Sequence, residues 1–335
     1  MSRARLAIVV AAGLVLLAGA GTLAYAAAGR ATHQQRSPVA TTSPAPLAGA
    51  DEATPDVSPN DLQPSPSPAV TTPPAAAATP APAATQPPSA PAPPPAAQSP
   101  AAPAHFGMVP PGAALPSGAQ CAAWVHARPI AENKRMNRAA NQVTGHGVGT
   151  ALMTGNDPAN QVIAPRIDGQ FTGTTHEILR WAACKWGIDE DIVAAQAALE
   201  SWWRQTNLGD YGTDPSRCPP GHGLGVDGTA GQCPESYGIL QNRFPYERST
   251  WPGIGSSTAM NADTAYAIWR ECFEGYEQWL NTVERGSQYG AGDAMGCVGR
   301  WFSGRWHTAD SDGYAQRVQG YISSRVWEAP DFQEP

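Results

Sequence analysis

The residues that can build a hydrophobic core are confined to the second part of this chain. All six Cys, all eleven Trp and eight of the nine Tyr lie at 121–327, whereas 23 of the 34 Pro lie at 38–116. A Pro/Ala/Ser/Thr tract buries too little apolar surface to offset the entropy lost on ordering it, while an aromatic-rich segment of this size can bury a substantial core. We therefore predict one globular domain at 119–335 after a disordered linker at 31–118.

The N-terminus has the pattern of an export signal. Arg3 and Arg5 precede an apolar run at 6–29, which ends in small residues that offer A-x-A cleavage sites. The run is also long enough to span a bilayer uncleaved. Residues 1–30 are thus predicted to be a signal peptide or an N-terminal membrane anchor, with the domain exported to the cell wall or medium in either case.

Six cysteines in an exported domain predict three disulfides, because thiols are rarely left free in an oxidising compartment. Cys218 and Cys233 flank a Gly/Pro-rich loop, CPPGHGLGVDGTAGQC, that would lack order without a cross-link, so we pair them. The other four are assigned as Cys121–Cys184 and Cys272–Cys297, although the sequence does not fix the full connectivity.

Two metal sites are weaker alternatives, and the prediction is that the domain binds no metal or cofactor. A zinc site would use Cys218, His222 and Cys233, but it lacks a fourth ligand and the usual spacing. A calcium site would use Asp210, Asp214 and Asp227, whose spacing matches no known loop pattern.

Apolar periodicity predicts a mainly α fold. The expected helices cover about 174–186, 189–203, 265–283 and 314–325. Thr174 with Glu177 three residues later forms a capping box for the first. No long alternating run predicts a strand.

Two motifs carry the chemistry. DEDIVAAQAALESWW at 189–203 ends an apolar helix in a Glu-Ser pair, and SYGILQ follows at 236–241. Together they resemble the active-site core of the lytic transglycosylases and goose-type lysozymes, which implies a lysozyme-like fold. The resemblance places the catalytic acid of the family on Glu200 and the second position of the pair on Ser201, and the Gln of the second motif is Gln241.

A third block of the family is an Asn before a helix and then an Ala-Tyr-Asn-Ala-Gly segment. Asn261 and the string RWFSGRW at 300–306 fall at those places. By the resemblance, Trp301 replaces the tyrosine that contacts the acid. We assign substrate binding to Ser201, Tyr237, Gln241 and Trp301, and Trp202 and Trp203 are further candidates for subsite walls, with plain core as the alternative for each of these aromatics.

The chain departs from the family at the second carboxylate. Goose-type lysozymes carry an acidic residue two positions beyond the motif Gln, where this chain has Arg243. Asp210 is the remaining candidate, but hydrolysis with inversion needs a second group that activates water. A mechanism with one acid fits better.

The implied activity is that of a peptidoglycan lytic transglycosylase, which cleaves the MurNAc–GlcNAc β-1,4 bond and leaves a 1,6-anhydro end. A muramidase, or a wall-binding module with the same fold and no catalysis, is the alternative. Chitin stays open as a substrate. The expected partners are glycan strands and, through the N-terminal segment, the cell membrane; we expect a monomer. The basic run NKRMNR at 133–138, in a chain of net charge −7, is interpreted as a solvated helix face and predicts no nucleic-acid site.

Overall fold

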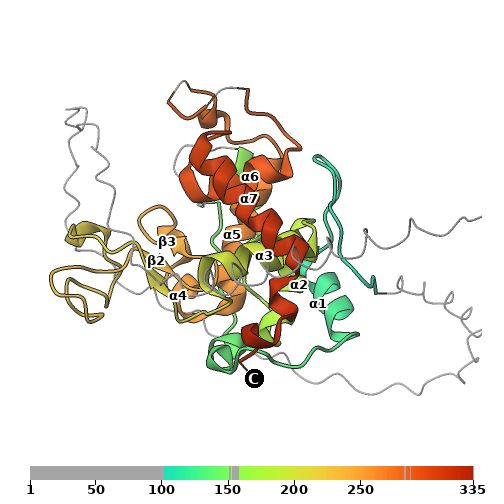
Figure 1. Cartoon of the computed structure of the whole chain (residues 1–335), viewed down its shortest axis with the longest axis horizontal. Helices are drawn as coiled ribbons and strands as arrows, with labels where there is room; N and C mark the ends of the chain where they lie inside the picture. The colour runs from blue at the N-terminus through green and yellow to red at the C-terminus, as the bar shows by residue number, and fades with distance from the viewer. Residues whose placement is uncertain (1–101, 151, 153–157, 283, 287, 335) are drawn as a thin grey trace, which may run out of the picture. The chain divides into compact units, whose positions relative to one another are not determined.

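The structure, a computed structural model, describes residues 102–150, 152, 158–282, 284–286 and 288–334 (Figure 1). The predicted signal or anchor at 1–30 and most of the predicted linker lie outside these residues. None of the helices in the described part of the chain has the length and hydropathy that a membrane crossing requires.

The described part is mainly helical, as predicted. The α-helices are α1 (Gly118–His126), α2 (Thr175–Trp186), α3 (Glu190–Ser201), α4 (Gly253–Ser256), α5 (Thr258–Phe273), α6 (Ala294–Ser303) and α7 (Ala309–Ser324). Short strands β1 (Leu208–Gly209), β2 (Ser236–Tyr237) and β3 (Asn242–Arg243) form an antiparallel sheet in that order. Helix α2 packs against α1, α3 and α5, and α7 packs against α3 and α6 (Figure 1). Helix α3 therefore packs against both α2 and α7.

Helix α2 begins and ends where its sequence predicts. The Thr174 hydroxyl accepts from the Glu177 backbone N–H at 3.3 Å, and the Glu177 carboxylate accepts from the Thr174 N–H at 2.8 Å. Gly187 then takes a left-handed conformation (φ 61°) that stops the helix.

The prediction of one helix over 265–283 was wrong at both ends. Helix α5 starts earlier, because the Ser257 hydroxyl caps it by accepting from the Met260 N–H at 3.1 Å. It stops at Phe273, since Gly275 turns the backbone to φ 82°. The apolar spacing nevertheless continues, because Tyr276 and Trp279 still pack on the core from beyond the helix. Helix α7 likewise begins five residues before the predicted start.

The three disulfides confirm the predicted pairing, namely Cys121–Cys184, Cys218–Cys233 and Cys272–Cys297. Helices α1 and α2 share the first, and α5 and α6 share the third. The second closes the Gly/Pro-rich loop beside β2.

The basic run at 133–138 is a solvated helix face only in part, because Arg135 and Arg138 are exposed whereas Lys134 and Asn137 are buried. Lys134 is fully buried, and its ammonium group donates to the Phe332 carbonyl near the C-terminus. Asn137 is buried as well, and its amide donates to the Trp203 carbonyl at 2.7 Å. The run thus joins the C-terminal segment to the end of α3, a tertiary contact that charge patterning does not reveal.

The linker also ends earlier than predicted, because residues 102–117 pack on the domain. Phe106 is only 6% exposed and belongs to the core. The Val109 N–H donates to the Gly187 carbonyl at 2.9 Å, and the buried Arg270 guanidinium donates to the Val109 and Pro110 carbonyls at 2.7 and 2.9 Å.

A fragment that starts at residue 119 should therefore be less stable than one that starts at 102. Losing the Phe106 ring costs ~3 kcal/mol, and each hydrogen bond lost to Arg270 or Gly187 costs ~1 kcal/mol. Urea unfolding of the two fragments measures the difference, with Phe106→Ala in the longer fragment as the control that isolates the ring. Equal midpoints for the two fragments would show that 102–118 contributes nothing.

Candidate active site

Helix α3 ends abruptly, and that end positions Glu200. Trp202 and Trp203 both adopt left-handed backbone conformations (φ 58° and 60°), which only a well-packed surrounding can hold in place of glycine. The Trp203 indole is fully buried and donates to the Ala194 carbonyl at 2.8 Å. Glu200 consequently lies in the last helical turn, where the unpaired backbone carbonyls disfavour a negative charge.

The GILQ turn joins β2 to β3 and needs its glycine. Gly238 has φ 79°, and a Cβ there would lie 2.3 Å from the Asn261 amide nitrogen. That nitrogen donates to the Tyr237 and Ile254 carbonyls, both at 2.7 Å, while the Asn261 side-chain oxygen accepts from the Leu240 N–H at 2.9 Å. Asn261, in the first turn of α5, thereby fixes the turn.

Ser201 and Gln205 fasten the same turn to the end of α3. The Ser201 hydroxyl donates to the Ile239 carbonyl at 2.8 Å, and the Ile239 N–H donates to the Gln205 side chain at 3.1 Å. The two sequence motifs therefore meet in space, with Glu200 one residue from the point of contact.

Two aromatic side chains from α6 and α7 reach the Glu200 carboxyl. The Tyr314 hydroxyl donates to Glu200 Oε1, and the Trp301 side chain lies close enough to lower the pKa of the carboxyl. Tyr314 is 2% exposed and stacks on Phe302, with the ring centroids 4.9 Å apart. The resemblance implied a tyrosine contact with the acid at the place of Trp301, and Tyr314 supplies such a contact from a different helix.

The Glu200 carboxyl is tuned to hold its proton near neutral pH. Burial raises the pKa of Glu200 to about 7, and the negative charge of Asp210 acts in the same direction. The hydrogen bond from Tyr314, the nearby Trp301 side chain and the positive charge of Arg317 oppose the rise. A carboxylic acid with such a pKa can donate a proton to a leaving oxygen.

Asp210, just after β1, is the second carboxylate near Glu200. Its side chain is 57% exposed, and it accepts from the Ser236 hydroxyl at 2.5 Å. Arg243 Nε lies 3.5 Å from its Oδ2 atom. The position where goose-type lysozymes carry an acid is thus occupied by a guanidinium that pairs with Asp210.

The four predicted substrate-binding residues do not form one surface. Trp301 is half-buried beside Glu200, but Ser201 is buried, 8% exposed, and bonds to the GILQ turn. Tyr237 is 2% exposed and donates to the Pro234 carbonyl at 2.9 Å, so the structure gives it no face for a ligand. Gln241 (φ 56°) folds over the turn and donates to the Gly238 carbonyl at 2.8 Å.

The proposed tryptophan walls also pack inward. Trp203 has no exposed surface, and Trp202 lies against Phe332, with ring centroids 4.6 Å apart. The expectation of subsite walls from Trp203 and Tyr237 was therefore wrong, because the Trp203 ring is buried in the core and the Tyr237 ring packs against His222 and Trp251.

The structure bears on the metal sites that the sequence left as alternatives. The zinc alternative is ruled out, because Cys218 and Cys233 are joined to each other and His222 bonds to Asp227 at 3.0 Å. Among the described residues, metal-ligand atoms gather at His105, Asp189 and Asp191, within 4.8 Å of one another. These three side chains already have partners, because His105 bonds to Asp189 and Asp191 pairs with Arg325.

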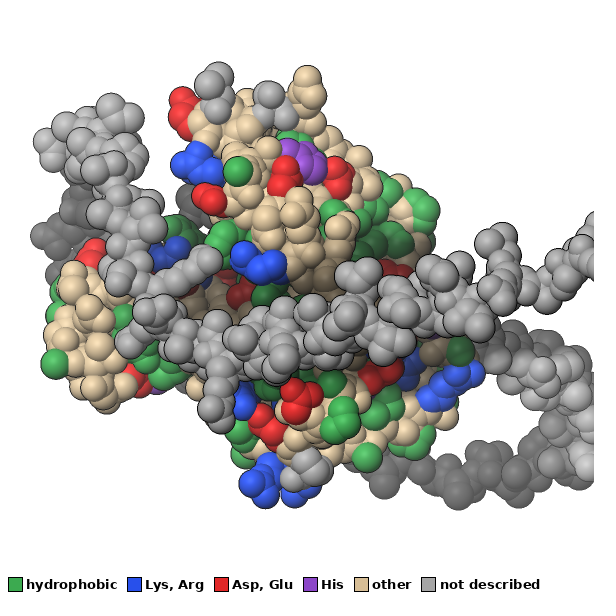
Figure 2. All heavy atoms as spheres, in the orientation of Figure 1, with side chains coloured by type: hydrophobic (Ala, Val, Ile, Leu, Met, Phe, Trp, Pro, Cys, Tyr) green, Lys and Arg blue, Asp and Glu red, His purple; other side chains and the backbone are tan. Residues whose placement is uncertain are grey.

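A hollow of about 200 Å³ lies on another part of the surface, over α6 and α7. Its lining includes Met295, His307 and Asp312, and Figure 2 shows acidic side chains on both sides of a histidine on this face. His307 bonds to Asp293 and Asp312, each at 2.9 Å, and these carboxylates raise its pKa against the opposing effect of burial. None of the predicted site residues lines this hollow.

Sequence reasoning missed Tyr314, Gln205 and Arg317. Tyr314 shows only as an apolar position in a helix, and nothing local indicates that α7 brings it to Glu200.

Comparison of the chain with protein-family models, curated proteins and solved structures finds no match.

Proposed function

We propose that this protein is a peptidoglycan lytic transglycosylase with a lysozyme-like fold, in which Glu200 is both acid and base. The observation that carries the proposal is the Glu200 carboxyl itself, which burial holds at a pKa of about 7 beside the Tyr314 hydroxyl and the Trp301 side chain. The proposed substrate, peptidoglycan, comes from the resemblance of the motifs at 189–203 and 236–241 to those of the lytic transglycosylases.

The reaction needs two proton transfers through this group. Protonated Glu200 donates to the oxygen between MurNAc and GlcNAc as that bond breaks. The resulting carboxylate takes the proton of the MurNAc 6-hydroxyl, whose oxygen closes on the anomeric carbon to form the 1,6-anhydro sugar. Tyr314 and Trp301 orient the carboxyl and stabilise its charged form between the two steps.

A muramidase is the second candidate, and Asp210 is the reason. It is exposed, and it is close enough for its charge to raise the pKa of Glu200. In a hydrolase Asp210 would position the attacking water. Its contacts with Ser236 and Arg243 hold it on one side of Glu200, which also suits a purely electrostatic role.

Product analysis separates these proposals. Purified wall digested with the protein should release muropeptides with anhydro ends, which are 18 mass units lighter than the reducing products of a hydrolase, the mass of one water. Mass spectrometry of the digest, before and after borohydride reduction, checks this, since anhydro ends resist reduction. Reducing ends alone would establish the muramidase, and no release with retained wall binding would establish a binding module.

A further inference from the structure

Two arginines at the surface of the disulfide-closed lobe share one carboxylate. Arg217 donates to both oxygens of Glu235, from Nε and Nη2 at 2.7 Å each, and Arg243 Nη2 donates to Glu235 Oε2 at 2.5 Å. The Glu235 side chain is 6% exposed, whereas Arg217 and Arg243 are 31% and 38% exposed. One buried negative charge thus holds two arginine side chains that are partly exposed.

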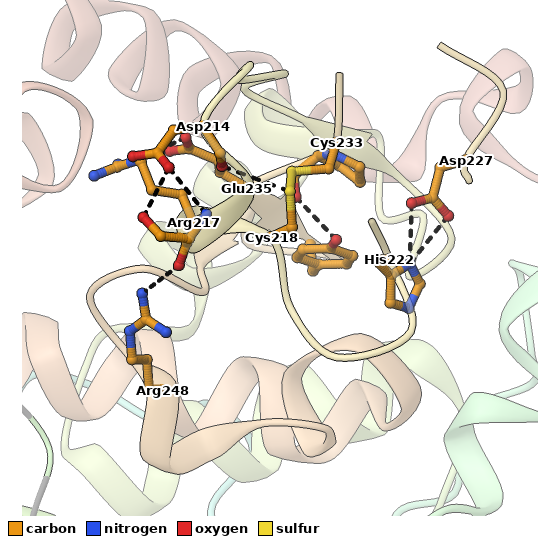
Figure 3. Close-up of a disulfide and its surroundings, with 11 residues drawn as sticks. Asp214, Arg217, Cys218, His222, Asp227, Cys233, Glu235 and Arg248 are labelled. Atoms are coloured by element: carbon orange, nitrogen blue, oxygen red, sulfur yellow. Dashed lines mark hydrogen bonds and ion pairs between the residues drawn. A yellow bond between two sulfur atoms is a disulfide. The ribbon is translucent and has the colours of Figure 1, made fainter. Parts of the chain in front are cut away.

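The disulfide makes this arrangement rigid. Cys218 follows Arg217 directly, Cys233 lies two residues before Glu235, and Figure 3 shows Arg217 and Glu235 facing each other beside the sulfur bridge. Glu235 occupies the Nε and Nη2 donors of Arg217, so the group that Arg217 offers to a ligand is the remaining Nη1 edge. A guanidinium that is fixed in advance loses little entropy when this edge binds an anion.

An exposed aromatic ring lies beside both arginines. The guanidinium carbons of Arg217 and Arg243 lie 5.4 and 5.1 Å from the centroid of the Tyr246 ring, which is 55% exposed. Such a ring can stack on a sugar or on the flat face of a peptide group, while the arginines bind charge.

The group is also connected to the catalytic carboxyl. Arg243 Nε has no hydrogen-bond partner among the described residues, and it lies 3.5 Å from Asp210, whose charge acts on Glu200. The order Glu200, Asp210, Arg243, Glu235, Arg217 leads from the proton donor onto the β-sheet lobe. A polymer bound across Glu200 and extended toward this lobe would meet both arginines.

We propose that Arg217, Arg243 and Tyr246 form a subsite for a carboxylate carried by the substrate, on the Asp210 side of the cleaved bond. The identity of this ligand rests on the proposed function. A wall glycan bears carboxylates on its peptides, and removal of the peptides leaves a free carboxylate on each lactyl group. Chitin bears neither. The subsite would make the protein prefer an anionic glycan to a neutral one.

Binding, measured without turnover, tests the subsite. Soluble wall fragments are titrated by calorimetry into Glu200→Gln protein, in three forms: with peptides, with peptides removed to leave lactyl carboxylates, and with all carboxylates amidated. Arg217→Gln is compared with Arg217→Lys and Tyr246→Ala. Arg248→Gln is the matched control, because Arg248 is an exposed arginine of the same lobe that donates to the Ser216 carbonyl and not to Glu235.

The carboxylate-bearing form that fits the subsite should bind about tenfold more weakly to Arg217→Gln, the effect of losing a hydrogen bond to a charged group. Amidated fragments should bind weakly and equally to every variant, and Arg248→Gln should match the parent. Whichever of the first two forms shows the loss identifies the source of the carboxylate.

Equal binding of amidated and unmodified fragments to the parent overturns the subsite. An equal loss of affinity for the two kinds of fragment in Arg217→Gln overturns it as well. Thermal unfolding of each variant shows whether its fold is intact, and the exposed Tyr246→Ala supplies the answer if Arg217→Gln unfolds. Continued cleavage by Glu200→Gln would refute the catalytic proposal alone, because the charge dependence of binding is read independently of turnover.

Discussion

Replacing Glu200 by Gln should lower the rate of wall cleavage by roughly 10²- to 10⁴-fold, the usual contribution of general acid catalysis. The amide keeps the shape of the side chain and can still meet the Tyr314 hydroxyl, so substrate binding should survive. Initial rates of muropeptide release, together with pull-down on insoluble wall, measure the two properties separately. A variant that cleaves at a rate near that of the parent would remove Glu200 from the mechanism.

Asp210→Asn is the companion variant that distinguishes the two enzyme proposals. A transglycosylase uses the 6-hydroxyl of the substrate as nucleophile, so losing Asp210 should cost less than tenfold and should lower the pKa of Glu200 by removing a nearby negative charge. A hydrolase that positions water through Asp210 should lose far more. The ratio of the two rate losses is therefore the decisive quantity.

The pH dependence follows from the same carboxyl. Cleavage needs protonated Glu200, so activity should fall as the pH rises through about 7. Stability has the same direction: the folded-state pKa lies above the unfolded value of 4.5, so the contribution of Glu200 is full below that value and is lost as the pH rises through 7. Glu200→Gln should consequently be more stable than the parent at pH 8, by up to ~3 kcal/mol.

Local signals predicted local structure well. Thr174, Glu177 and Gly187 define the ends of α2 by contacts within a few residues, and the Cys218–Cys233 pairing follows from the loop between them. The overlong helix at 265–283 shows the limit, because the apolar stripe records burial of Tyr276 and Trp279 whether or not the backbone stays helical. Only the left-handed Gly275 reveals the break.

The site was predictable in part for the same reason. Glu200 and the GILQ turn are short motifs, and their contact through Ser201 and Asn261 follows once the chain is folded. Tyr314 reaches Glu200 across 114 positions of sequence. The buried Lys134 likewise donates to the carbonyl of Phe332, close to the C-terminus of the chain. Such contacts depend on how helices pack, and residue type alone carries no sign of them.

The second large effect concerns Asp263, a fully buried carboxylate on α5 that organises charge in the core. Its Oδ2 accepts from Lys185 Nζ at 2.7 Å and from the Gly169 N–H at 2.8 Å, while Oδ1 accepts from the Trp186 indole at 2.8 Å. Lys185 is itself only 2% exposed, and its other carboxylate partner is Asp168, which is 41% exposed.

Asp263→Ala should lower the free energy of unfolding by roughly 3–5 kcal/mol, because it leaves a buried ammonium group and several buried N–H groups without their acceptor. Asp168→Ala removes the exposed partner of the same lysine and should cost ~1 kcal/mol or less. Urea unfolding of both variants measures the contrast, and similar losses in the two would refute the importance of burial here.

The cause of the loss can also be isolated. If the unpaired charge of Lys185 dominates, adding Lys185→Met to Asp263→Ala should recover part of the stability, since the methionine side chain fits the buried path of the lysine without its charge. No recovery would mean that the orphaned N–H groups of Gly169 and Trp186 carry the cost instead. In either case Asp263→Ala should retain cleavage at low temperature, because Asp263 lies outside the Glu200 contacts and acts only by holding α5 and α2 together.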